Sequence, residues 1–392
     1  MRNIILLGLV SFFSDISSEM VYPIIPLYLT SVFGATPVLV GVIEGIAESV
    51  ASLLKVFSGY LTDKYHNKKP VAFLGYATGL VYKIGLLIAS SWTGILVARV
   101  IDRIGKGIRT APRDVLVSES ADKKSIGKAF GIHKAMDMSG SAIGIFVAYR
   151  LLAKGHGVFD YKKLFLISII PAILGLIALL CVTEKKQKLP IKGREMFWHR
   201  LKDLNVNLKF YLLVTFIFTL GNSSNTFLLL RAKSVGFTDT NVVLLYLLYN
   251  ITAALLSIPF GKLSDKIGRK KVLVAGYITF AIVYLGFAWA SKATTLVIAF
   301  IIYGFYTAMV AGAERALIAE VSPPELKGTM LGLHSTIVGI ALLPASIIAG
   351  LLWNVFGASV PFAFGASLSL LAAVLLMLLL NSQTTEKSDR VI

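Results

Sequence analysis

Long apolar stretches separated by short polar breaks fill nearly the whole chain of 392 residues. A helix that crosses a bilayer needs about 20 consecutive, mainly apolar residues. The pattern predicts twelve such helices, at 4–32, 38–62, 71–90, 93–117, 125–152, 163–182, 208–231, 240–263, 272–291, 294–318, 327–352 and 360–381. They leave no room for a separate soluble domain, so we expect an all-α polytopic membrane protein.

The first apolar stretch begins like a secretory signal peptide, with Arg2 ahead of apolar residues. Asp15 and Glu19 interrupt it and no small-residue cleavage site follows, so we expect a retained helix. Pro23 and Pro26 predict a kink within this helix, because proline removes a backbone donor and clashes with the preceding turn.

Composition and charge agree with a membrane protein and fix an expected orientation. Only 15% of the residues are charged, against about 25% in soluble proteins. Of the 39 Lys and Arg, 22 fall in segments on the side of the N-terminus and 6 on the other side. This positive-inside bias predicts that both termini are cytoplasmic and that the protein lies in the cytoplasmic membrane. The basic excess then contacts anionic lipids, and we expect no nucleic-acid partner.

The two halves of the chain repeat each other. The segment Gly59-Tyr-Leu-Thr-Asp63-Lys64 matches Gly261-Lys-Leu-Ser-Asp265-Lys266 at an offset of 202 residues. At an offset of 201, four positions match: Glu119, Gly127, Gly131 and His133 with Glu320, Gly328, Gly332 and His334. A near-constant offset indicates a duplicated six-helix unit. The expected domains are an N-terminal bundle, a basic cytoplasmic linker, a C-terminal bundle and a cytoplasmic tail, at 1–183, 184–207, 208–382 and 383–392.

With these features the chain resembles the major facilitator superfamily, in a prokaryotic branch. The sharpest element is the segment from Gly261 to Lys271, which is similar to the family's signature for the turn after the second helix of each half. The first copy has His66 and Asn67 where the family has Gly and Arg. The resemblance covers essentially the whole chain and implies two pseudo-symmetric bundles of six helices around a central cavity.

The signature turn also predicts a latch between conformations. A glycine lets neighbouring helices approach closely, and an aspartate at a helix end accepts charge-assisted hydrogen bonds from its neighbour. A static role in topology is the alternative. The expected latch residues are Asp63, Lys64, Asp265, Lys266, Arg269 and Arg113.

Ionisable side chains inside predicted transmembrane helices are costly and mark candidate functional sites. At about 100° per residue, Glu44 and Glu48 share one face of the second helix, and Asp15 and Glu19 share one face of the first. The fourth helix carries a cationic stripe that cannot face lipid. A rise of about 1.5 Å per residue places most of these charges near the bilayer midplane, where secondary transporters bind their substrates.

We therefore expect two sets of site residues, with fixed interhelical ion pairs as the alternative for the charged ones. The proton-coupling set is Asp15, Glu19, Glu44, Glu48 and Arg103, where the role of Arg103 is implied by the resemblance of Arg103-Ile-Gly105-Lys-Gly107 to the family's fourth helix. The substrate cavity set is Tyr22, Arg99, Asp102, Asp137, Asn222, Asn225, Tyr249 and Asn250.

The predicted function is secondary active transport of a small molecule by alternating access, coupled to protons, with efflux of a drug or metabolite favoured by analogy. The alternatives are a carrier of lipids or lipid precursors, and a transporter of metals or organic cations. The segment Ser139-Gly140-Ser141-Ala142 lacks the Gly-Pro signature of the family's proton antiporters, which argues against efflux.

Other classes of function find little support. No nucleophile with a base and no set of metal ligands stands out, so we expect neither an enzyme nor a cofactor nor a bound metal. Cys181 is the only cysteine, which excludes an internal disulfide. The expected partners are the substrate, protons and membrane lipids, and the chain is expected to act as a monomer.

Overall fold

The computed structural model describes residues 2–65, 68–120, 126–153, 158–184, 206–321 and 327–388, and every regular element in these segments is a helix. The elements are α1 (Arg2–Val21), η1 (Tyr22–Ile24), α2 (Ile25–Phe33), α3 (Pro37–Tyr65), α4 (Lys68–Ile88), α5 (Trp92–Glu119), α6 (Ile126–Ala153), α7 (Val158–Leu180), α8 (Val206–Gly221), α9 (Thr226–Ser234), α10 (Asp239–Ile267), α11 (Arg269–Trp289), α12 (Ala293–Val321), α13 (Lys327–Phe356) and α14 (Val360–Ser388).

These elements make the twelve predicted crossings. The first crossing consists of α1, η1 and α2, and the seventh consists of α8 and α9. Within the described segments, ten crossings are long and apolar enough to span a bilayer by composition alone; α5 and α6 are not among them. The charged stripe of α5 explains its exclusion, because that helix carries its polar groups toward the protein interior rather than toward lipid.

Two crossings are broken near their middle. In the first, Pro23 lies in the single turn of 3₁₀ helix between α1 and α2, which confirms the predicted kink. The seventh breaks without a proline, between Gly221 and Thr226. Short polar side chains fill this break, and the hydroxyl of Ser224 accepts a hydrogen bond from the backbone N–H of Thr226 at 3.3 Å. Both breaks thus lie inside a crossing rather than at its end.

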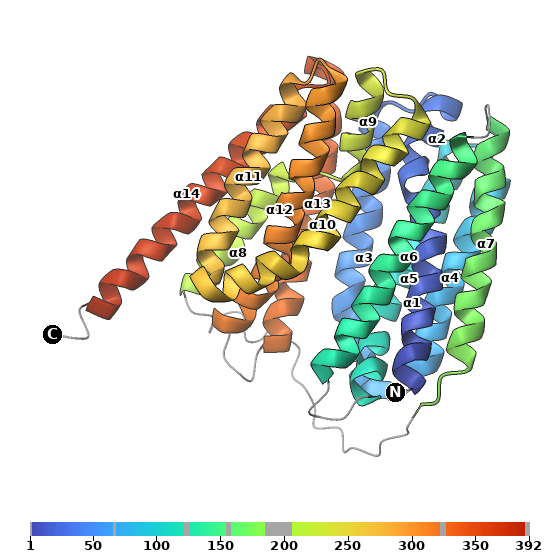
Figure 1. Cartoon of the computed structure of the whole chain (residues 1–392), viewed down its shortest axis with the longest axis horizontal. Helices are drawn as coiled ribbons and strands as arrows, with labels where there is room; N and C mark the ends of the chain where they lie inside the picture. Colours follow the sequence, from blue (N-terminus) through green and yellow to red (C-terminus); the bar gives the residue numbers. More distant parts are fainter. Residues whose placement is uncertain are drawn as a thin grey trace.

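The helices form two bundles, α1–α7 and α8–α14, which lie side by side (Figure 1). Helix α3 packs closely on α13 across the boundary. A Cβ atom added at Gly41 would lie 2.4 Å from the carbonyl oxygen of Ser346, so only glycine permits this approach. The hydroxyl of Ser49 donates to the carbonyl of Gly339 at 2.5 Å.

The bundles also meet at the end opposite the N-terminus, which is the upper end in Figure 1. There the hydroxyl of Tyr161 on α7 donates to the carboxylate of Asp239 on α10, which also pairs with Lys233. A Cβ atom added at Gly350 of α13 would lie 2.7 Å from Cα of Val38 on α3. The two halves are therefore closed against each other at this end.

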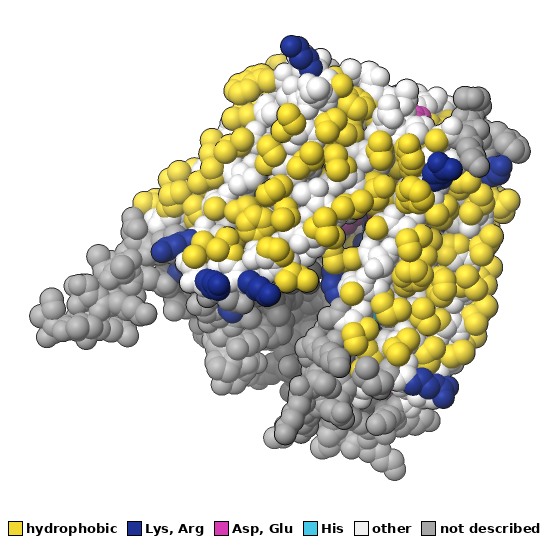
Figure 2. All heavy atoms as spheres, viewed as in Figure 1, with side chains coloured by type: hydrophobic (Ala, Val, Ile, Leu, Met, Phe, Trp, Pro, Cys, Tyr) yellow, Lys and Arg dark blue, Asp and Glu magenta, His cyan; other side chains and the backbone are white. Residues whose placement is uncertain are grey.

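The outer surface is mainly apolar, and a hollow between the halves contains charged side chains (Figure 2). Large hydrophobic residues such as Leu255 (71% exposed) and Ile170 (59% exposed) point outward along whole helices. Such a surface is stable only in contact with lipid tails, so the chain is a multi-pass membrane protein. Most of the expected linker, residues 185–205, lies outside the described residues, as do the last four residues of the tail.

Candidate functional site

A cavity of 190 Å³ lies between the two halves. Most of its wall comes from α1 and α5, while the second half contributes two residues. The lining residues are Asp15, Ser18, Glu19, Tyr22, Glu48, Tyr82, Arg99, Asp102, Arg103, Lys106, Arg109, Asn225 and Tyr246.

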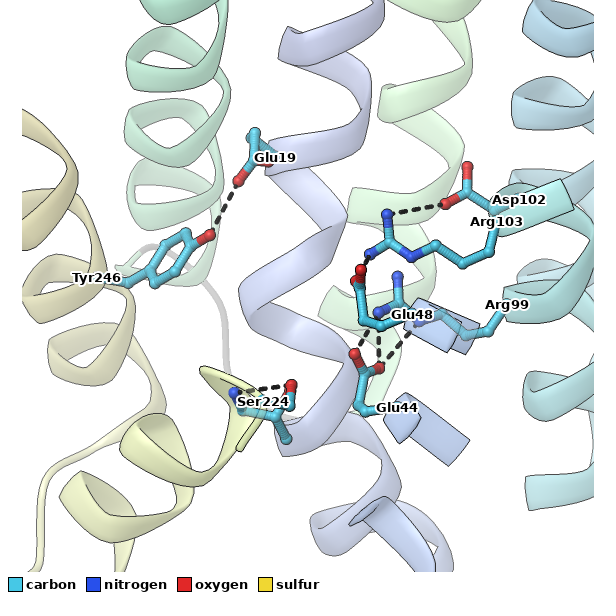
Figure 3. A network of polar contacts seen from close by, with 9 residues as sticks. Glu19, Glu44, Glu48, Arg99, Asp102, Arg103, Ser224 and Tyr246 are labelled. Atoms are coloured by element: carbon cyan, nitrogen blue, oxygen red, sulfur yellow. Dashed lines mark hydrogen bonds and ion pairs between the residues drawn. The ribbon is translucent and has the colours of Figure 1, made fainter. Parts of the chain in front are cut away.

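The strongest contact beside this cavity is a buried ion pair between Arg99 of α5 and Glu44 of α3. The Nη2 atom of Arg99 lies 2.5 Å from one carboxylate oxygen of Glu44, and Nε lies 3.0 Å from the other. Only 2% of Arg99 and 1% of Glu44 are exposed. This two-pronged geometry binds α5 to α3 and neutralises both charges (Figure 3).

Arg103, one turn further along α5, bridges two carboxylates. Its guanidinium lies 2.9 Å from Glu48 on α3 and 3.8 Å from Asp102 on its own helix (Figure 3). The ring of Tyr22 lies beneath both guanidinium groups, 5.4 Å from that of Arg99 and 5.7 Å from that of Arg103. The Nε atom of Arg103 is buried and has no hydrogen-bond partner among the described residues.

Two further cations of α5 face the cavity and form no ion pair within the described part of the chain, Lys106 and Arg109. The guanidinium of Arg109 lies 4.4 Å from the ring centre of Tyr76 on α4. A Cβ atom at Gly75 would lie 2.7 Å from that of Arg109, so glycine makes room for this side chain. Both positive charges are thus available to a ligand.

The opposite wall is acidic and comes from α1. Glu19 accepts a hydrogen bond of 3.2 Å from the hydroxyl of Tyr246 on α10, which joins the two halves inside the cavity (Figure 3). The carboxyl group of Asp15 lies beside that of Asp137 on α6. Asp137 also accepts from Ser11 at 3.0 Å and pairs with Lys134 at 2.7 Å.

The second half contributes amide and aromatic groups. The side chain of Asn225 accepts a hydrogen bond of 2.7 Å from Tyr303 and donates one of 3.4 Å to Tyr249. Asn222, on the other side of the same break, donates to Tyr306 at 3.0 Å. The ring of Tyr246 lies 5.7 Å from that of Tyr22. This wall is uncharged, unlike that of the first half.

The structure brings most of the predicted cavity and coupling residues together and leaves some outside the wall. Eight predicted residues line the cavity: Asp15, Glu19, Tyr22, Glu48, Arg99, Asp102, Arg103 and Asn225. The remaining five lie in the layers behind it: Glu44, Asp137, Asn222, Tyr249 and Asn250.

Four of the other lining residues were not predicted as site residues: Ser18, Tyr82, Lys106 and Arg109. Lys106 lies on the same stripe of α5 as Arg99 and Arg103, so helical spacing alone could have identified it as a site residue. Nothing in the pattern distinguishes Tyr82 from other tyrosines of apolar helices.

Half of the six predicted latch side chains lie outside what the structure describes. The side chains of Asp63, Lys64 and Asp265 are not among the described ones. Lys266 is exposed beside the Gly268 turn, and Arg113 pairs with its neighbour Asp114 at 2.8 Å. Arg269 begins α11, as the signature turn predicts. The latch role of all six residues stays a prediction. Among the described residues, no three His, Cys, Asp or Glu side chains are grouped as metal ligands.

Comparison with known proteins gives the family. The model of the major facilitator superfamily matches residues 7–229 and 211–391. An uncharacterized MFS-type transporter, MJ1317 of Methanocaldococcus jannaschii, is 39% identical over 382 residues, which cover 96% of this chain and 94% of that protein. The multidrug resistance protein MdtG of Escherichia coli is 23% identical over 95% of this chain and 93% of its own length.

Solved structures show the same fold. A point mutant of the nucleoside transporter NupG superposes with a TM-score of 0.83 at 13% identity, covering 96% of this chain and 99% of its own. A D-xylose–proton symporter superposes with a TM-score of 0.77 at 15% identity, covering 96% of both chains. With its two bundles, the cavity between them and a family match over nearly the whole length, this chain belongs to the major facilitator superfamily and is a multi-pass secondary transporter, not an enzyme.

Proposed function

We propose that this transporter is coupled to protons and exports a small metabolite by antiport. The observation that carries the proposal is the hydrogen bond between Glu19 and Tyr246, which crosses between the halves inside the cavity. A bond to an ionised carboxylate stabilises by about 1.5–3 kcal/mol and a neutral one by about 0.5–1.5 kcal/mol. Protonation of Glu19 therefore weakens this link by about 1 kcal/mol, which changes the balance between two conformations several-fold.

The surroundings of Glu19 suit a group that gains and loses a proton. Asp15 lies one turn before it on α1, Asp137 faces it from α6, Arg103 and Lys106 face it from α5, and Tyr246 faces it from α10. Negative neighbours favour the protonated carboxyl group and positive ones favour the ionised form. Asp15 and Asp137 place two further carboxyl groups beside it.

The size of the cavity favours a metabolite. Pockets for drug-sized ligands have about 300–1,000 Å³, and this one has 190 Å³. A cavity of this size also disfavours a lipid as the substrate. Export is supported by the similarity to MdtG, whose name describes multidrug resistance, and by the orientation expected from the charge bias. With that orientation, the end at which the two halves are closed faces outward, and the cavity takes up its ligand from the cytoplasm.

The test uses everted membrane vesicles that contain the protein and an acidified lumen, monitored with a fluorescent amine that reports the pH gradient. An antiported compound should dissipate the gradient in wild-type vesicles and not in empty ones. Glu19→Gln should remove this response. The matched control is Glu184→Gln, because Glu184 lies outside the cavity, where it accepts hydrogen bonds from the backbone N–H groups of Lys68 and Lys69. If compounds that stabilise the purified protein never dissipate the gradient, proton antiport is wrong.

A further inference from the structure

We propose that the substrate is a small zwitterion, bound with its cationic group at Asp15 and Glu19 and its anionic group at Lys106 and Arg109. The inference rests on the proposed transport function and specifies the class of substrate. It follows from how the charges of the cavity wall pair with one another.

Half of the eight charged side chains of the wall already have ion-pair partners. Arg99 pairs with Glu44, and Arg103 pairs with both Glu48 and Asp102. These pairs belong to α3 and α5, and they remain together whichever way the halves move. A ligand that used them would have to break a buried ion pair, which leaves an uncompensated charge in a medium of low dielectric constant.

Four lining charges are left over, and they lie on two facing helices. On α1, Asp15 lies beside Asp137, and Glu19 accepts a hydrogen bond from Tyr246. Neither Asp15 nor Glu19 forms an ion pair among the described residues. Lys106 and Arg109 on α5 likewise form no ion pair in the described part of the chain. All four line the same cavity of 190 Å³. The cavity thus has one negative and one positive side, and neither side neutralises the other by direct contact.

This arrangement discriminates between classes of ligand. A cation alone satisfies the carboxylates and adds its charge to that of Lys106 and Arg109. An anion alone satisfies Lys106 and Arg109 and adds its charge to that of Asp15 and Glu19. A zwitterion supplies a counter-charge to both sides, so it alone gives a partner of opposite charge to each side. The buried Nε of Arg103, which has no partner among the described residues, adds a donor beside the cationic side.

The remaining walls suit the uncharged part of such a molecule. Tyr22 and Tyr246 flank the cavity with their rings 5.7 Å apart, and Asn225 supplies an amide from the second half. A cavity of 190 Å³ corresponds to about six water molecules at the volume per molecule of liquid water. An amino-acid-sized ligand fits these dimensions. Its ammonium group also competes with protons for the same two carboxylates, as an exchange mechanism requires.

Binding of matched probes to the purified full-length protein tests the proposal, with thermal stabilisation as the readout. The probes are free α-amino acids of increasing side-chain size and ω-amino acids of increasing chain length. Each is compared with its amide, which is a cation, and with its N-acetyl derivative, which is an anion. We expect at least one zwitterion to bind at least tenfold more tightly than both of its derivatives. Equal or tighter binding of a derivative in every set, or no binding of any zwitterion, would overturn the proposal.

Variants assign the two sides of the cavity. Lys106→Gln should weaken binding of the zwitterion at least tenfold and leave that of the amide within twofold, whereas Glu19→Gln should weaken both and leave that of the N-acetyl compound within twofold. Lys162→Gln, an exposed position on α7 away from the cavity, is the matched lysine control. If both variants discriminate between the probes as the wild type does, the assignment is wrong. The comparison of probes on the wild-type protein does not depend on the folding of either variant.

The vesicle assay separates failure of this inference from failure of the proposed function. A zwitterion that binds but never dissipates the pH gradient argues against antiport and leaves the substrate class intact. A gradient that is dissipated by amides and not by zwitterions argues against the substrate class and leaves proton coupling intact.

Discussion

Replacing Glu44 by Gln would leave the guanidinium of Arg99 buried between α3 and α5 without a counter-charge. Both side chains are at most 2% exposed, so water cannot compensate for the lost carboxylate. Removing one partner of a buried ion pair typically costs about 3–5 kcal/mol. For a unit of the size of one bundle this corresponds to a fall in apparent Tm of about 6–20 °C.

The double variant Glu44→Leu with Arg99→Met provides the comparison that decides the role of the pair. Apolar residues of similar volume often replace a buried ion pair without loss of stability, or with a gain of about 1–4 kcal/mol. We therefore expect the double variant to recover most or all of the Tm lost in Glu44→Gln. Thermal unfolding of the purified protein, followed by size-exclusion chromatography of heated samples, measures both. Glu184→Gln controls for the chemical change from Glu to Gln.

Two results would refute this reasoning. A fall in Tm of less than about 2 °C for Glu44→Gln would mean that the charge of Arg99 is compensated by other groups. A double variant as unstable as the single one would mean that packing around the pair, rather than its charge, holds α3 to α5. If Glu44→Gln is stable and also abolishes the response to a pH gradient, Glu44 takes part in proton coupling as the sequence predicts, and its pairing with Arg99 is not a permanent structural contact.

Three further predictions concern other parts of the molecule. Asn225→Ala should weaken substrate binding by about 1–3 kcal/mol while the pH profile of transport is retained, because it removes a neutral partner of two buried tyrosines; an altered profile would contradict this. Single cysteines replacing Lys188 and His156, on a Cys181→Ala background, should be labelled by an impermeant reagent from opposite sides; labelling of both from outside would overturn the expected orientation. Asp265→Asn should shift the accessibility of cavity cysteines without loss of expression; unchanged accessibility with lower expression would indicate a static structural role.

The sequence predicts the fold closely because the bilayer restricts the possible structures. A crossing must satisfy its backbone hydrogen bonds internally over a fixed thickness, so the apolar stretches translate directly into helices. The stretch predicted at 93–117 is the helix Trp92–Glu119, and the one at 272–291 is Arg269–Trp289. The break at 222–225 was not predicted, because Asn and Ser are tolerated inside transmembrane helices and only the tertiary contacts of Asn222 and Asn225 show that they interrupt one.

The site could be predicted only in part. Helical spacing places Arg99 and Arg103 on one face of their helix, and the cost of exposing them to lipid requires acidic partners on neighbouring helices. Which carboxylate each of them meets depends on the rotation of α3 against α5, and spacing along one helix does not give that rotation. The bond from Tyr246 to Glu19 joins residues 227 positions apart, so it follows from the packing of two bundles rather than from any local pattern.

The division of charges between the halves has a consequence for movement. The ion pairs beside the cavity, Arg99 with Glu44 and Arg103 with Glu48, both lie within the first half, so rotation of one half against the other need not break them. The cavity contact that such a rotation must break, among the described residues, is the bond from Tyr246 to Glu19. Breaking one hydrogen bond to a carboxylate costs about 1.5–3 kcal/mol, far less than separating a buried ion pair, and protonation of Glu19 lowers that cost. The group that holds the cavity hydrogen bond between the halves is therefore also a group that can exchange a proton with the cavity.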